Sequence, residues 1–171
     1  AGGGLGRAIA EQFAAAGAHI VALDKDAATV ASLQATLEAR GRACLSLPCD
    51  VTDPDACARA IAAAIERFGA LDVLVNNAGM SHRSGLAETD LAVIRRVMDV
   101  NFFGAVHCTK AALPRLVERR GLVIAISSVA GYTPLIARTG YAASKHALHG
   151  FFESLRTEVA PQGGQVMMVC P

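Results

Sequence analysis

Short apolar runs of strand length recur along this sequence and are separated by longer segments with helical periodicity. The apolar runs cover residues 18–23, 43–47, 71–75, 122–126 and 166–170, and the helical segments cover roughly residues 5–16, 27–40, 54–68, 91–119 and 140–157. Apolar strands that alternate with helices are typical of a parallel sheet buried between helical layers, with right-handed crossovers. The alternation therefore predicts an α/β fold: a doubly wound parallel sheet with helices on both faces.

Tyr141 and Lys145 are the first candidate functional pair. They lie four residues apart in the segment 140–157, which carries apolar residues at helical spacing. Residues at i and i+4 share one face of a helix, so the Lys145 ammonium is expected beside the Tyr141 phenol. A neighbouring cation favours the ionised form of a phenol and eases proton exchange near neutral pH. The pair is a candidate acid/base device, although exposed helices also carry this spacing without function.

Two serines follow the apolar run 122–126, and the second of them, Ser128, precedes Tyr141 by thirteen residues. Open α/β sheets bind ligands at the carboxyl ends of their strands. The hydroxyl group of Ser128 is therefore expected at such an edge, and Ser128 joins Tyr141 and Lys145 as a candidate site residue.

A glycine cluster opens the sequence and leads directly into the helical segment 5–16. Glycines ahead of a helix let the backbone approach a phosphate, and the helix N-terminus supplies N–H donors and the positive end of its dipole. The candidate phosphate-binding residues are Gly2, Gly3, Gly4, Leu5 and Gly6. A glycine-rich terminus without a ligand is the alternative interpretation of the same residues.

Asp24 follows the apolar run 18–23 and lies twenty residues after Gly4. Dinucleotide-binding folds place at this point the carboxylate that hydrogen-bonds the ribose hydroxyl groups. A carboxylate also repels a 2′-phosphate, so Asp24 favours NAD over NADP. A capping role for Asp24 before the helix expected from residue 27 is compatible with this function.

Further polar motifs lie between these elements. Asn76, Asn77, Ala78 and Gly79 follow the apolar run 71–75, and Asn101 lies inside the helical segment 91–119. Together with Ser128, Tyr141 and Lys145, and in this order, they resemble the short-chain dehydrogenase/reductase superfamily of Rossmann-like, single-domain enzymes. The resemblance covers essentially the whole chain.

The resemblance implies catalytic roles for four residues. Tyr141 would be the general acid/base at the substrate oxygen, and Ser128 would hydrogen-bond that oxygen and stabilise developing charge. Lys145 would assist Tyr141 and hold the nicotinamide ribose. Asn101 would link the lysine to solvent through a water molecule.

The resemblance also implies cofactor contacts beyond the glycine cluster and Asp24. Asp50 and Val51 would contact adenine. The motif with Asn77, Ala78 and Gly79 would tie neighbouring strands together through its amides and leave room for the cofactor. NAD is the expected cofactor, with NADP as the less favoured one.

The implied function is that of an oxidoreductase that transfers a hydride between NAD and a small-molecule alcohol or ketone. One alternative is an enzyme of the epimerase or dehydratase type that holds NAD tightly. Gly4 and Gly6 fit the Gly-x-x-x-Gly-x-Gly turn of single-domain enzymes if a glycine precedes Ala1, whereas Gly3 and Gly6 fit the Gly-x-x-Gly-x-x-Gly of epimerase relatives. The motif at residues 76–79 argues against the epimerase type.

A second alternative is a non-catalytic NAD-binding protein that keeps the fold. The intact set of Asn101, Ser128, Tyr141 and Lys145 argues against it. A panel of alcohols with a nicotinamide absorbance assay would distinguish the three functions.

Composition excludes several other classes of function. The net charge is +1, no basic block is interleaved with aromatic residues, and no apolar run approaches the ~18 residues of a membrane span. Neither nucleic acid nor a membrane is an expected partner. Five scattered cysteines without zinc-type spacing predict reduced, buried thiols in a cytoplasmic protein, and the histidines show no ligand clustering, so no metal is expected.

Residues 1–171 are expected to form a single dinucleotide-binding domain. The sequence starts with Ala1 inside the glycine cluster and stops at Pro171 after an apolar run. Compared with the superfamily, the first strand and everything after the sixth strand, including most of the substrate-specificity loops, would lie outside this sequence. The predicted fold is therefore truncated at both ends.

Phe151 and Phe152 suggest self-association. Adjacent helical positions point about 100° apart, so one helix can hardly bury both rings against its own sheet. The superfamily forms dimers and tetramers by packing this helix and the one with Phe102 and Phe103 against symmetry mates. We expect a homodimer or homotetramer with Phe151 or Phe152, together with Leu155, at the interface. The alternative is that both rings pack within the same chain.

Overall fold

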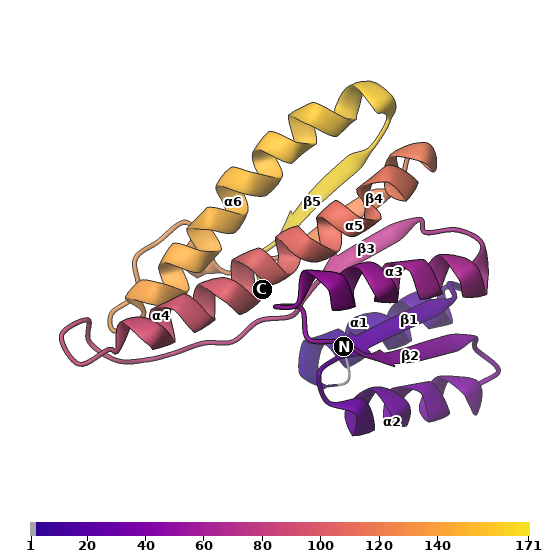
Figure 1. The fold of residues 1–171 in the computed structure, drawn as a ribbon, viewed down its shortest axis with the longest axis horizontal. Helices are drawn as coiled ribbons and strands as arrows, with labels where there is room; N and C mark the ends of the chain where they lie inside the picture. Colours follow the sequence, from indigo (N-terminus) through magenta and orange to yellow (C-terminus); the bar gives the residue numbers. More distant parts are fainter. Residues whose placement is uncertain (1–2) are drawn as a thin grey trace.

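The computed structural model describes residues 3–171 and has the α/β architecture that the sequence predicts (Figure 1). Its α-helices are α1 (Gly4–Ala15), α2 (Ala27–Glu38), α3 (Pro54–Phe68), α4 (Leu91–Met98), α5 (Gly104–Glu118) and α6 (Thr139–Val159). Its strands are β1 (Ile20–Asp24), β2 (Cys44–Pro48), β3 (Val73–Asn76), β4 (Leu122–Ile126) and β5 (Gln165–Val169). Every predicted strand and helix overlaps an observed element.

All paired strands are parallel, but they form two sheets. β1 pairs with β2, and β3, β4 and β5 form a three-stranded sheet in that order. A cavity of about 400 Å³ lies between the two sheets and is lined by residues of α1, β1 and β3, among them Phe13, Val21 and Val75. The predicted parallel sheet is thus interrupted in its middle, because within residues 3–171 no strand lies between β1 and β3.

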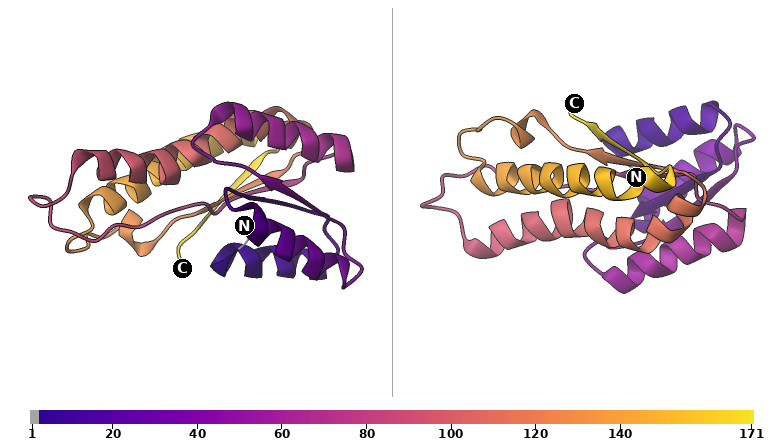
Figure 2. Two further views of the ribbon diagram at one scale, coloured as in Figure 1. Left: turned by 60° about the horizontal axis from the view of Figure 1, so that its bottom comes forward. Right: turned by 90° about the horizontal axis from the view of Figure 1, so that it is seen from above.

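Helices cover the strands from both sides, as predicted. α1 and α2 pack on β1 and β2 around a cluster that contains Ala14, Ala22, Val30, Leu33 and Leu37. α3, α5 and α6 form the layer on the opposite side, where they pack on one another and on β3, β4 and β5. The left view of Figure 2 shows the two helical layers on opposite sides of the strands.

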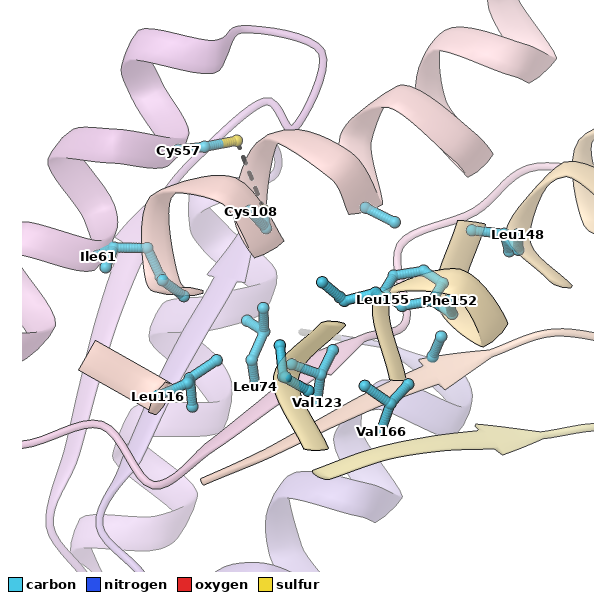
Figure 3. Packing of buried hydrophobic residues seen from close by; sticks show 14 of the residues in the cluster. Cys57, Ile61, Leu74, Cys108, Leu116, Val123, Leu148, Phe152, Leu155 and Val166 are labelled. Atoms are coloured by element: carbon cyan, nitrogen blue, oxygen red, sulfur yellow. Dashed lines mark hydrogen bonds between the residues drawn. The ribbon is translucent and has the colours of Figure 1, made fainter. Parts of the chain in front are cut away.

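The larger core lies between α6, α5 and α3 and the three-stranded sheet. Figure 3 shows Leu148, Phe152 and Leu155 of α6 above Val123 of β4 and Val166 of β5. The Phe152 side chain is completely buried. Full burial of such a ring stabilises the fold by roughly 2–3 kcal/mol, so α6 is held to the sheet mainly by its apolar face.

The predicted subunit interface at Phe152 and Leu155 is wrong for these two residues. Their side chains are only 0% and 5% exposed, inside the core of the same chain. Phe151 is half-buried and packs edge-on against Phe102, with 5.9 Å between the ring centroids. The two adjacent rings of α6 are accommodated by two different neighbours, the sheet and Phe102. Among the four phenylalanines of the prediction, Phe103 keeps the largest exposed surface, 44%.

Capping residues set the helix boundaries. Asp26 precedes α2 and Asp53 precedes α3, and each carboxylate accepts hydrogen bonds from backbone N–H groups of the first turn. Pro54 occupies the first position of α3, where its missing N–H is not needed. Gly69 ends α3 in the left-handed conformation with φ 79°, which costs a glycine little.

The long helical segment predicted over residues 91–119 contains a change of helix type. A π-helical turn, Asp99–Phe103, joins α4 to α5 and has Asn101 at its centre. A π-turn adds one residue to a helical turn and is frequent at functional sites. Asn101, which the sequence placed inside one continuous helical segment, therefore lies in a wider helical turn.

Candidate functional site

Three strands end at one small cavity of about 90 Å³. Its lining includes Leu23 from β1, Val51 just after β2, and Asn76, Asn77 and Ala78 at the end of β3. Between β2 and β3 the chain passes from one sheet to the other, and open α/β sheets bind ligands at such a point. The cavity is thus a candidate ligand site, and the predicted cofactor residues Val51, Asn77 and Ala78 meet there.

The glycine loop lies at the N-terminus of α1. Gly4 begins the helix with φ 51°, a left-handed conformation that favours glycine, and Gly3 precedes it in an extended conformation. Gly3, Gly4 and Leu5 are exposed, whereas Gly6 is buried and lines the 400 Å³ cavity together with Asn77. The N–H groups of a first helical turn have no partner within the helix, so this end suits an anion. Gly2 lies outside the residues that the structure describes.

Asp24 ends β1 at the same edge, next to Leu23, and is half-buried. Its Oδ1 accepts a hydrogen bond of 3.2 Å from the backbone N–H of Asp26. Asp26, not Asp24, is the N-cap of α2. The capping role considered for Asp24 is therefore wrong. The Asp24 carboxylate lies at the end of β1 and does not cap α2.

Asp50 and Val51 form the turn after β2. The Asp50 carboxylate accepts hydrogen bonds from the backbone N–H and the hydroxyl group of Thr52, at 3.0 and 2.8 Å, and these bonds lower the pKa of Asp50. The Val51 carbonyl accepts a hydrogen bond of 3.0 Å from Nδ1 of His107. A Cβ at Gly104 would lie 2.6 Å from Cγ2 of Val51, so a glycine there lets this turn pack closely against α5.

Tyr141 and Lys145 lie on one face of α6, as their spacing predicts. The Lys145 Nζ is 5.8 Å from the centroid of the Tyr141 ring. Lys145 is only 5% exposed, and its ammonium donates a hydrogen bond of 2.9 Å to the carbonyl of Ile126 at the end of β4. Burial lowers the pKa of Lys145, because the charged form loses solvation. Tyr141 is half-buried.

Asn101 is 1% exposed and all of its amide is engaged. Its Oδ1 accepts a bond of 2.7 Å from the Met80 backbone N–H, and its Nδ2 donates to the Met80 carbonyl and to the Ser144 hydroxyl group, both at 2.9 Å. Asn101 thus fixes the start of the loop after β3 to α6. A Cβ at Gly79 would lie 3.4 Å from Asn101 Oδ1 and 3.9 Å from Lys145 Nζ, so Gly79 adjoins both groups.

Ser128 follows β4 in an extended conformation and caps the short 3₁₀ turn Val129–Gly131, since its Oγ accepts a hydrogen bond of 3.2 Å from Ala130 N. Lys145 holds the carbonyl of Ile126, two residues before Ser128. Two groups of predicted residues therefore emerge. Asp24, Asp50, Val51 and Asn77 lie at the ends of β1, β2 and β3, while Ser128, Tyr141 and Lys145 lie around β4 and α6. Gly79 links the two groups through its position beside Lys145.

Sequence reasoning assigned no role to Ser144, which holds this arrangement together. Its hydroxyl group donates to the Tyr141 carbonyl at 2.7 Å and accepts the Nδ2–H of Asn101. The signal that could have found it is a serine on the apolar face of the helix, three residues after Tyr141. The amide of Asn76 was expected to tie neighbouring strands, but its Nδ2 donates to Thr109 Oγ1 of α5 at 2.9 Å.

The structure also shows the state of the cysteines, the grouping of possible metal ligands and the character of the helices. Cys44, Cys49, Cys57 and Cys108 are buried, Cys170 is half-buried, and all five thiols are free. Among residues 3–171, no three His, Cys, Asp or Glu side chains gather in a way that could hold a metal ion. No helix in that range combines the length and the apolar character that crossing a membrane requires.

Comparison with curated proteins relates the whole chain to one family. A family model described as short chain dehydrogenase matches residues 1–171. The chain is 43% identical over 175 residues to dehydrogenase/reductase SDR family member 7B from Bos taurus, and the match covers 98% of this chain and 54% of that protein. The chain thus spans about half the length of this relative.

Solved structures similar to this chain include members of the same family. A metagenomic short-chain oxidoreductase in complex with NADP matches with a TM-score of 0.94 and 30% identity, over 99% of this chain and 78% of that one. A 7α-hydroxysteroid dehydrogenase complexed with NADH and 7-oxo glycochenodeoxycholic acid matches with a TM-score of 0.95 and 27% identity, over 99% and 67% of the two chains. The resemblance drawn from the sequence motifs is confirmed, and the chain belongs to the short-chain dehydrogenase family.

Proposed function

We propose that the protein is an NAD-dependent oxidoreductase that interconverts an alcohol and a ketone. The observation that carries the proposal is the buried Lys145, which lies beside the Tyr141 ring and holds the strand end that leads to Ser128. Burying an ammonium costs free energy, and buried ionisable groups of this kind cluster at functional sites. Here the ammonium lies next to Tyr141, which carries the only phenol of α6. The pairing suits acid/base chemistry at a substrate oxygen.

The residues at the strand ends fit a dinucleotide. Gly3, Gly4, Leu5 and Gly6 at the start of α1 suit the pyrophosphate, because the helix N-terminus there is open and glycine-rich. The cavity lined by Val51, Asn77 and Ala78 lies at the strand ends where the adenosine half would lie, and Asp50 directly precedes Val51 in the chain. Gly79 leaves space beside Asn101 and Lys145, where a side chain would approach both polar groups. When bound, the dinucleotide supplies or accepts the hydride.

The chain's own residues handle the proton. Tyr141 takes the hydroxyl proton from an alcohol, or returns a proton to the oxygen of a ketone, while Ser128 donates a hydrogen bond to the same oxygen. Lys145 provides positive charge beside the phenol and hydrogen-bond donors for a ribose. Asn101 fixes the loop after β3 and would link Lys145 to solvent through a water molecule.

Asp24 supports the choice of NAD over NADP. Its carboxylate ends β1 at the edge where the ribose of a dinucleotide would lie, and a negative charge there repels a 2′-phosphate. Relatives of this chain have been solved with either cofactor, so the preference rests on Asp24 itself.

We also propose that residues 1–171 act as one dinucleotide-binding domain within a homodimer or homotetramer. Phe103, at the end of the π-turn before α5, and the half-buried Phe151 of α6 offer the apolar surface for such an interface. Five free thiols suit a reducing compartment such as the cytoplasm.

The test is a binding and turnover experiment with the native protein. Titration with NADH, followed by its fluorescence, measures binding, and absorbance of the nicotinamide measures turnover with a panel of primary alcohols, secondary alcohols and ketones. Binding with net oxidation or reduction is the expected result. Binding with product formation but no net change in NADH would identify an epimerase-type enzyme, and binding without any product would identify a non-catalytic protein.

A further inference from the structure

A third residue of α6 continues the row that contains Tyr141 and Lys145. His149 lies four residues after Lys145, so all three side chains share one face of the helix. Lys145 holds the carbonyl of Ile126, and Nε2 of His149 makes a hydrogen bond of 2.8 Å with Oγ of Ser127, the next residue along the chain. Two successive residues at the end of β4 are thereby tied to two successive turns of α6.

Ser127 is held from both sides. It is 4% exposed, and its backbone N–H donates a hydrogen bond of 2.7 Å to the Val169 carbonyl of β5. Its hydroxyl group points to the opposite neighbour, His149. The backbone of Ser127 is therefore fixed by the sheet and its side chain by the helix, directly before Ser128.

The imidazole of His149 also determines where the following turn lies. A Cβ at Gly131 would come within 2.5 Å of both Nε2 and Cδ2 of the ring, so this close approach requires a glycine. The Tyr132 ring covers the imidazole from outside, with 4.1 Å between the ring centroids. His149 is enclosed by residues at both ends of the segment 127–132, and Ser128 lies between them.

We propose that His149 is a positioning residue: through Ser127 and Gly131 it fixes the segment 127–132 and so orients the hydroxyl group of Ser128 toward the substrate oxygen. The inference rests on the proposed function, in which Ser128 donates a hydrogen bond to that oxygen. A hydrogen-bond donor that stabilises charge in a transition state must be held in place before the reaction, and small displacements are costly.

The protonation state agrees with this role. Burial lowers the pKa of His149, while Glu153 on the next turn of α6 opposes that shift, and His146 and Lys145 add to it. A neutral ring near neutral pH has one nitrogen that accepts a hydrogen bond, so the Ser127 hydroxyl group can donate to Nε2.

The bond can be removed from either side. His149→Phe keeps a ring of similar size without a hydrogen-bonding nitrogen, Ser127→Ala removes the hydroxyl group, and His149→Gln restores a polar group that can reach Ser127. His146→Phe is the matched control, because His146 lies on the exposed side of the same helix. Each native-length variant is checked by circular dichroism and by its affinity for NADH, and kcat and KM are measured with the best substrate of the panel.

We expect kcat to fall about 10- to 100-fold in His149→Phe and in Ser127→Ala, with KM and NADH affinity within about 2-fold of wild type, because the hydroxyl group of Ser128 acts mainly in the transition state. The double variant should fall no further than either single one, His149→Gln should recover most of the rate, and His146→Phe should match wild type.

Wild-type kcat in both His149→Phe and Ser127→Ala would overturn the inference, as would a double variant whose losses multiply. A loss of NADH affinity equal to the loss of kcat would also overturn it, because that pattern reports a general collapse of the site. Failure of the proposed function looks different: the wild-type protein itself would then bind NADH without turning over any member of the panel.

Discussion

Asn101 and Ser144 are 43 residues apart in the sequence, yet their buried side chains share a hydrogen bond of 2.9 Å between Nδ2 and Oγ. Ser154, on the same helix, offers a matched comparison, because its hydroxyl group also donates to a carbonyl of its own helix but is exposed. We expect Ser144→Ala to lower the free energy of unfolding by about 1–3 kcal/mol, since Nδ2 of Asn101 loses a buried acceptor. Ser154→Ala should change it by less than about 0.5 kcal/mol. Urea denaturation compares the two, and equal losses would contradict this account of Asn101.

Tyr141→Phe removes one oxygen atom from the candidate acid/base and leaves the ring beside Lys145. If Tyr141 exchanges the proton, turnover should fall by at least about 100-fold while NADH affinity stays within a few fold, because the hydroxyl group acts in the chemical step. Single-turnover kinetics and an NADH titration separate the two effects. Retention of more than a tenth of the wild-type rate would exclude Tyr141 as the acid/base.

Lys145 should make stability depend on pH. Burial lowers its folded-state pKa below the ordinary 10.5, so between those two values the unfolded chain binds more protons than the folded one. The free energy of unfolding of the wild type, relative to Lys145→Met, should therefore rise as pH rises toward 10.5 and stay constant below the folded-state pKa.

Thermal unfolding of the two proteins at a series of pH values measures this difference. Lys110→Met, at an exposed position of α5, is the control and should follow the wild-type curve. A difference between wild type and Lys145→Met that is constant from about pH 7 to 10.5 would show that the folded protein does not perturb this ammonium.

Asp24→Ser should weaken the discrimination between NAD and NADP. The substitution removes the charge that repels a 2′-phosphate, so the ratio of kcat/KM for the two cofactors should fall by about 10-fold or more, an effect above 1.4 kcal/mol. Asp26→Asn removes an equal charge two residues away and keeps the cap of α2, so it should leave the ratio near that of wild type. Equal use of both cofactors by the wild type would refute the assignment of Asp24.

Phe103→Glu tests the proposed assembly. Phe103 is 44% exposed on the π-turn before α5, and a charge there should weaken an apolar contact between copies of the chain. Light scattering at several concentrations should show a smaller assembly for Phe103→Glu than for wild type. Thr157→Glu, at an exposed position near the end of α6, should not change the mass. A wild-type monomer at every concentration would end the proposal.

The fold could be predicted because its signals are local. Each strand is mostly apolar and each helix has its own periodicity, so the predicted bounds lie close to the observed ones, as for Leu122–Ile126 and Pro54–Phe68. The cap of α2 was harder. Asp24 and Asp26 are both acidic residues before the helix, and only the backbone conformation selects Asp26. The prediction for Phe152 and Leu155 failed because helical geometry alone does not say how many neighbours surround a helix.

The sequence predicted candidate residues for the site but not the contacts that those residues make. The spacing of Tyr141 and Lys145 is local and follows from the helix, whereas the partner of Lys145 is a carbonyl of β4. Likewise Asn101 binds the backbone of Met80, and Ser127 binds His149, contacts that depend on how the loop after β3, the π-turn, β4 and α6 pack. Backbone partners leave no signature in the side-chain sequence, and the His149 partner of Ser127 lies 22 residues away on another element, so these contacts appear only with the structure.

The π-turn at Asp99–Phe103 has a consequence for how this gene can change in length. The π-turn takes up one residue more than an α-turn, so deleting one residue there would leave an ordinary α-helix in which α5 keeps its rotation relative to α4. A deletion inside α5 would instead rotate the residues beyond it by about 100°. Val97 of α4 and Ala112 and Leu116 of α5, all buried, would still face the core together after a deletion in the π-turn. The π-turn is therefore the point in this helical segment at which the loss of one codon changes the buried face least.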